Sequence, residues 1–172
     1  MNKKFLGSLF IALAFAANAL PAADAPLSQA AKKGDTAQVR NLITRGANVN
    51  VQNNSGWTPL HEAVRFGHTE CAQLLLQKGA NINAQSNTCW TPLHSAARWN
   101  QIECVRLLLH YGANPETKNN YGQTAKNLAQ KYGLQETVNV LQNWVDFLET
   151  KEPESAADEE AASASSAPSN QE

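Results

Sequence analysis

One short segment of the chain occurs twice, and its surroundings repeat with it. Thr-Pro-Leu-His stands at residues 58–61 and again at residues 91–94, 33 residues later. Gly-Ala-Asn follows the same offset at residues 46–48, 79–81 and 112–114. A fixed period of this length predicts short units that stack on their neighbours and share one continuous core. The folded part is therefore expected to be an elongated solenoid.

The repeated segments resemble those of the ankyrin repeat family, in which Thr-Pro-Leu-His marks units of a turn and two helices. The resemblance covers roughly residues 24–149 and implies an all-α solenoid with capping first and last repeats. The four expected repeats lie near residues 24–54, 55–87, 88–120 and 121–149. A solenoid of this kind offers an extended concave face to another protein.

The residue types within each full unit fit this arrangement of helices. Thr58 and Thr91 are expected to cap the first helix, and the prolines that follow take its first position, where the missing N–H costs nothing. Gly67 is expected to end this helix with a positive φ, and Asn100 replaces it in the next unit. The second helix carries leucine at one equivalent position in all four units: Leu42, Leu75, Leu108 and Leu141.

The two ends of the array depart from the repeated pattern, as capping repeats require. Residues 25–28 are a weakened form of Thr-Pro-Leu-His, and Lys126 replaces a leucine that is expected to be buried in the full units. A charge there is tolerated only if no further unit stacks on that side. We therefore expect the array to end with this unit and its longer second helix.

The N-terminal residues are expected to lie outside the repeat domain, residues 23–149. Residues 1–22 begin with a basic pair, continue with an apolar stretch too short to span a bilayer, and end in small residues near Ala19 or Ala22. This pattern predicts a secretory signal peptide. We expect a periplasmic or secreted bacterial protein, monomeric and free of the membrane after cleavage. In a eukaryotic secretory route, Asn53 would be a glycosylation acceptor.

The C-terminal residues 150–172 are rich in alanine, serine and acids and are expected to be disordered. This tail holds one lysine against six acids, whereas residues 23–149 hold 11 lysines and arginines against 9 acids. An acidic tail on a slightly basic body either screens the binding face or keeps the protein soluble. Solubility is the simpler explanation from sequence alone.

The histidines of the repeated segment are weak candidates for chemistry. His61 and His94 occupy equivalent places in neighbouring units, about 8 to 10 Å apart, which is too far for a shared zinc ion. In the ankyrin repeat family this histidine holds the turn together through hydrogen bonds to backbone. We therefore expect no metal, no cofactor and no catalytic residue.

The three cysteines fall into two groups. Cys71 and Cys104 occupy equivalent inward places and are expected to be core thiols, too far apart for a disulfide. Cys89 stands where two other units have glycine at the tip of the turn, a place that requires positive φ. We expect its thiol to be exposed, so that it is either a tolerated substitution or a redox residue.

The clearest functional pattern lies at the ends of the first helices. Every unit has a cation there, an aromatic follows in three units, and two tryptophans come just after the turn tips. Partner contacts in the ankyrin repeat family come mostly from these places, and Trp, Tyr and Arg dominate the binding energy of protein interfaces. The alternative is that the rings cover their own turns. The candidate partner-binding residues are Trp57, Arg65, Phe66, Trp90, Arg98, Trp99, Lys131 and Tyr132.

These features predict a non-enzymatic protein that binds an acidic or mixed surface of one protein partner. The small net charge of the body and the expected export argue against nucleic acid. The resemblance to small exported bacterial ankyrin proteins implies a link with periplasmic catalases and oxidative-stress protection. Two alternatives stay open, namely an immunity-type inhibitor of a toxin and a thiol-dependent redox protein that uses Cys89.

Overall fold

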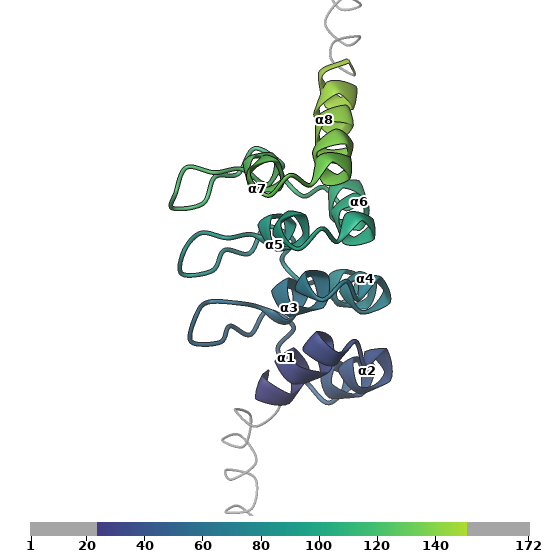
Figure 1. Ribbon diagram of the computed structural model, residues 1–172. Helices are drawn as coiled ribbons and strands as arrows, with labels where there is room; N and C mark the ends of the chain where they lie inside the picture. The colour runs from purple at the N-terminus through teal and green to yellow at the C-terminus, as the bar shows by residue number, and fades with distance from the viewer. Residues whose placement is uncertain (1–23, 151–172) are drawn as a thin grey trace, which may run out of the picture.

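A computed structural model describes residues 24–150, which fold into helices and connecting loops without any strand in that range. The helices come in four antiparallel pairs, and the pairs stack on one another (Figure 1). The expected all-α repeat solenoid is therefore confirmed. The helices are α1 (Asp24–Lys33), α2 (Thr36–Thr44), α3 (Pro59–Arg65), α4 (Thr69–Gln77), α5 (Pro92–Arg98), α6 (Ile102–His110), α7 (Ala125–Lys131) and α8 (Gln135–Thr150).

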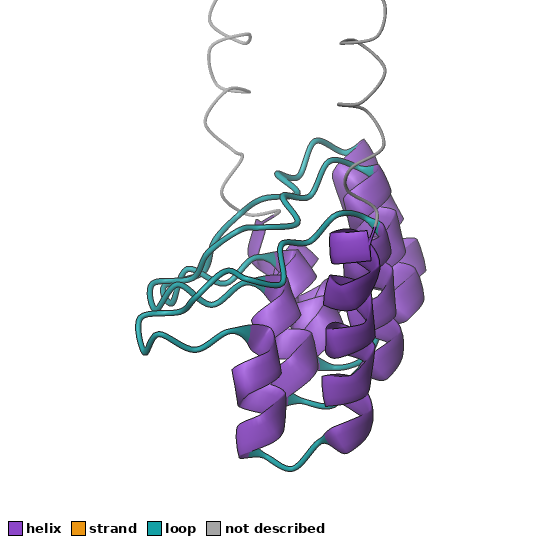
Figure 2. Cartoon of the chain, turned by 90° about the horizontal axis from the view of Figure 1, so that it is seen from above, coloured by secondary structure: helices purple, strands orange, loops and turns teal. Residues whose placement is uncertain are grey.

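The pairs give the molecule two columns of helices. The first helices, α1, α3, α5 and α7, form the inner column, and the second helices, α2, α4, α6 and α8, form the outer column (Figure 1). Three long loops, residues 45–58, 78–91 and 111–124, project away from the helices on one side (Figure 2). We call the surface of the inner column beside these loops the inner face.

The predicted signal peptide, residues 1–22, lies outside the described residues, as does the predicted tail beyond Thr150, so both stay predictions. Within residues 24–150, every helix is too short or too polar to span a membrane.

Each inner helix after α1 begins at a threonine cap. The side chain of Thr58 accepts a hydrogen bond from the His61 backbone N–H, and Thr91 and Thr124 do the same in their units. Pro59 follows the first of these caps without the loss of a needed hydrogen bond. The repeated Thr-Pro-Leu-His segment thus encodes the start of a helix.

The core runs the length of the stack between the two columns. Small side chains such as Ala63 and Ala96 are fully buried and let successive inner helices approach closely. The outer column supplies larger groups, including Leu75 and Leu108, which are also fully buried. Because each unit covers its neighbour, removing one unit would expose the apolar side of the next.

Two residues other than glycine adopt the left-handed conformation that was expected of them. Asn100 has φ 55°, and its side chain also accepts a hydrogen bond from the Thr137 hydroxyl in the next unit, with 2.8 Å between the oxygens. Cys89 has φ 57° at the tip of its loop. The residue is half-buried, so it is less exposed than expected but more open than the buried Cys71 and Cys104.

The last unit closes the stack. Lys126 is half-buried, and its ammonium group donates a hydrogen bond to the Gln142 side chain at 2.8 Å. A charged group that is held in this way offers no apolar surface for a fifth unit. The outer helix α8 has 16 residues, against 9 in α4 and in α6, and rises beyond α7 (Figure 1).

We predict that Cys89→Gly stabilises the protein by about 1 kcal/mol, because glycine adopts positive φ without the steric cost that a Cβ atom incurs. Urea unfolding followed by circular dichroism measures the change. Cys89→Ala is the control, since it removes the thiol and keeps the Cβ atom. Equal stability of the two variants would show that the backbone at this position is not strained.

Candidate functional site

Cations and aromatic rings alternate along the inner face. They come from the C-terminal ends of the inner helices and from the residue that follows each helix. We call this set the cation–aromatic column. Its members, in order along the stack, are Lys32, Phe66, Arg65, Trp99, Arg98 and Tyr132.

Each arginine of the column contacts a ring of its own unit and a ring of the next. The Cζ atom of Arg65 lies 5.3 Å from the ring centre of Phe66 and 4.9 Å from that of Trp99. The Cζ atom of Arg98 lies 5.0 Å from the Trp99 ring and 3.5 Å from the Tyr132 ring. The column is therefore continuous across the last three units, because each guanidinium bridges two of them. Lys32 extends it to the first unit, since its Nζ atom lies 5.5 Å from the Phe66 ring centre.

The two arginines keep their hydrogen-bonding groups available. Both side chains are half-buried, yet among the side chains that the structure describes no acid pairs with them and no acceptor receives a hydrogen bond from either guanidinium. A guanidinium that stacks through its faces still presents N–H donors in its plane. The arrangement can thus bind a carboxylate edge-on.

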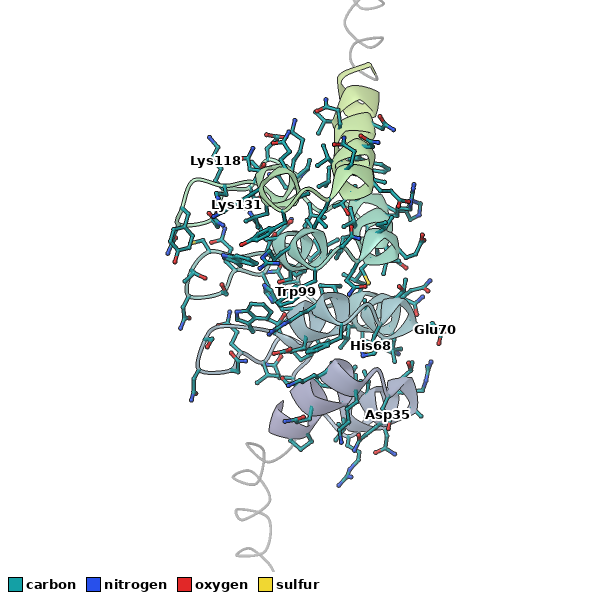
Figure 3. The ribbon with its side chains drawn as sticks, viewed as in Figure 1. Asp35, His68, Glu70, Trp99, Lys118 and Lys131 are labelled. Carbon is teal, nitrogen blue, oxygen red and sulfur yellow. The ribbon has the colours of Figure 1, made fainter. Side chains whose placement is uncertain are left out.

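The rings of the column are partly open to solvent. Phe66, Trp99 and Tyr132 are 41%, 43% and 44% exposed. Lys131 is exposed at the end of the column, on the side of the stack from which the loops project, whereas Glu70 lies on the opposite side (Figure 3). Six of the eight predicted residues therefore lie together along the inner face, and their role in binding stays a prediction.

The remaining two predicted residues, Trp57 and Trp90, follow the alternative that was left open. Both are half-buried, and their rings stack with centres 6.5 Å apart at an angle of 27°. Each also lies against the histidine of its own unit, with ring centres 5.5 Å apart for His61 and 6.2 Å for His94. The Cζ atom of Arg65 lies 5.4 Å from the Trp57 ring centre, so the tryptophan pair contacts the column through this arginine.

The two histidines connect neighbouring units. The Nε2 atom of His61 lies 2.9 Å from the Trp90 carbonyl oxygen, and that of His94 lies 2.9 Å from the Gln123 carbonyl oxygen. Because a carbonyl oxygen only accepts, Nε2–H donates and Nδ1 is left to accept from the threonine cap. The Thr58 backbone N–H donates to this Nδ1 at 3.2 Å.

This geometry favours the neutral imidazole in both residues. Burial lowers the pKa of His61 from 6.5 to about 4, against the opposing effect of the hydrogen bond to Trp90. Burial also lowers the pKa of His94. A proton on Nδ1 would place two donors face to face at the threonine cap. The histidines are thus structural, as expected, and they join units as well as holding their own turns.

A second set of contacts between units was not foreseen from the sequence. His68 Nε2 lies 3.0 Å from the Lys32 carbonyl oxygen, and the Gln101 side chain donates to the Arg65 carbonyl at 3.3 Å. Each of the two residues directly precedes the outer helix of its own unit. Each bonds to the last turn of the inner helix in the unit before, at the backbone carbonyl of a residue whose side chain belongs to the column. His68 and Gln101 are 33 residues apart, and this spacing was the signal in the sequence. The two residue types are so different that their positions were not recognised as equivalent.

The buried cysteines are poor nucleophiles. Burial raises the pKa of Cys71 to about 11 and also raises that of Cys104. All three cysteines are free thiols. Within the described part of the chain, no group of three or more His, Cys, Asp or Glu side chains could hold a metal ion.

A hollow of about 560 Å³ marks the N-terminal end of the inner face. It lies between α1 and the first long loop, and Lys32 and Glu62 line it together with residues 51–55. The hollow adjoins the first cation of the column. The inner face therefore begins with an open polar recess.

Comparison with known families bears on the whole repeat region. A family model described as ankyrin repeats, in three copies, matches residues 27–119 and 89–150. The chain belongs to the ankyrin repeat family. None of the curated proteins compared with it matches. Ankyrin repeats are generally protein–protein interaction modules and typically lack enzymatic activity.

We predict that this ankyrin repeat protein loses stability on acidification between pH 6.5 and about 4. The lower folded-state pKa of His61 means that the unfolded chain binds the proton first, at a cost of roughly 3 kcal/mol once pH falls below 4. Urea unfolding at a series of pH values measures this loss.

His61→Asn is the matched variant, because Asn127 fills the equivalent place in the last unit and completes the same threonine cap. The variant should be less stable at neutral pH and should show a shallower dependence on pH. A slope identical to that of the wild type would contradict the assignment.

Proposed function

We propose that this protein is exported to the periplasm and binds one protein partner through the cation–aromatic column. The single observation that carries the proposal is the pair of stacked arginines without an acceptor. Arg65 and Arg98 are held by rings on their faces, and their in-plane donors have no acidic partner among the described side chains. The occupant that fits them carries carboxylates at about the repeat spacing.

The charge distribution supports an acidic partner surface. Among the described side chains, the inner helices hold six lysines and arginines against one acid. Those of the outer helices are two arginines and three acids. Positive charge is thus concentrated on the inner helices, although the whole body is nearly neutral. An acidic surface would be steered to the inner face.

The rings supply the apolar part of the same interface. Phe66, Trp99 and Tyr132 are large, partly exposed and already ordered by their cations. Large aromatic groups that lose little freedom on binding are typical hot spots of protein interfaces. A partner that covers the column would desolvate the cation–ring contacts and strengthen them.

Oxidative-stress protection is a finer part of the proposal and rests on the resemblance to small exported bacterial ankyrin proteins. An immunity-type inhibitor would use the same column against a toxin, so the partner's identity separates the two. A thiol-dependent role depends on Cys89, since the other two thiols are buried. The strained backbone of Cys89 does not by itself point to redox chemistry.

We expect that Arg98→Glu combined with Trp99→Ala abolishes capture of the partner from a periplasmic extract, as measured by affinity purification and mass spectrometry. The charge reversal repels an acidic surface, and the truncation removes the ring that both arginines contact. Circular dichroism should show unchanged helical content.

Arg106→Glu is the control, because Arg106 is an exposed arginine on the outer helix α6. It changes the net charge in the same direction and leaves the column intact. Retention of the same captured proteins by the double variant would rule out the column as the binding surface.

A further inference from the structure

The cation–aromatic column has a candidate occupant in the chain itself. Residues 151–172 lie outside the described residues and carry six acids against one lysine, and five of the acids fall within residues 152–160. We infer that this acidic segment docks on the column of its own molecule and competes with the protein partner. The competition with the partner rests on the proposed function, in which the partner binds the column. The docking of the segment does not depend on it.

Charge complementarity favours the inner face over every other described surface. The column and its end offer four cations, Lys32, Arg65, Arg98 and Lys131, at one position of each unit. The helices that contact α8 are α6, with one acid and one arginine, and α7, with two lysines and no acid, so the attraction on an acidic segment that leaves α8 comes from α7. The segment therefore finds its attractive surface across the top of α7.

The length of the segment permits this contact. Helix α8 has 16 residues and is about 24 Å long, and a short turn separates its start from Lys131. Lys131 is thus within about 30 Å of the end of α8, and Arg98 lies about 10 Å further along the stack. A ten-residue segment spans at most about 33 to 36 Å, so Glu160 reaches Lys131. The twelve residues that follow have the length to approach Arg98, and Glu172 is the acid among them.

The contact is expected to be weak and reversible. Each exposed ion pair contributes little to binding, and salt screens it. The covalent link between the segment and the repeat domain offsets part of this weakness, because a tethered segment acts at an effective concentration in the millimolar range. A partner with several carboxylates and an apolar surface for the rings would displace the segment, whereas weaker acidic proteins would be excluded. The segment would thus raise the specificity of the column.

The test compares amide and indole NMR signals of the ¹⁵N-labelled full chain with those of a neutralised variant, E152Q/E154Q/D158N/E159Q/E160Q. No partner is present, so failure of the proposed function leaves the result unaffected. We expect the signals of Lys131 and Tyr132, and of Arg98 that stacks on the Tyr132 ring, to shift between the two proteins at low salt. Signals of α2 and α4 should stay in place, and high salt should abolish the difference.

Two controls separate the segment's charge from other effects. Ser155→Ala combined with Ser163→Ala alters the segment and keeps its acids, so the spectrum should match that of the wild type. Lys131→Gln should shrink the shift that neutralisation causes at Tyr132, whereas Arg106→Gln on the outer face should not.

Three outcomes would overturn the inference. Column signals that superpose in the wild type and the neutralised variant would show that the segment does not dock there. Shifts that disappear on dilution would assign the contact to a second copy of the chain. An effect of Arg106→Gln equal to that of Lys131→Gln would assign it to net charge alone.

Discussion

The contact between successive repeats is the interaction on which the rest of the structure depends. No unit can bury its apolar side alone, so small residues such as Ala63 and Ala96 bring the inner helices close together. His61 and His94 then join each unit to the backbone of the next. Because the units are stacked at a fixed interval, residues at equivalent positions line up, and the ends of the inner helices become a column of cations and rings.

Features that depend on local sequence could be predicted residue by residue. The threonine caps, the left-handed backbone of Cys89 and Asn100 and the buried places of Cys71 and Cys104 all follow from one repeated pattern. Contacts between units could be predicted only in outline, since they depend on the rotation of one unit against the next. The bridging of two rings by one guanidinium, the stacking of the two loop tryptophans and the half-burial of Cys89 belong to this class.

The column differs from a row of solvated surface charges because its cations are held in place. A free arginine loses considerable side-chain freedom when it binds, whereas Arg65 and Arg98 already lie between rings. Their flat faces are occupied and their edges are open, which restricts the binding partner to groups that accept hydrogen bonds in the guanidinium plane. Carboxylates meet this condition, whether they belong to a partner or to the chain's own acidic segment.

The central claim is that an acidic protein surface binds on the inner face, along the ends of the inner helices. Cross-saturation NMR of the labelled protein with its captured partner tests this most directly, because it reports which amides the partner covers. The account predicts loss of intensity at Arg65, Trp99 and Tyr132 and little change in α4 and α6. Loss confined to the outer helices, with the column unaffected, would contradict it.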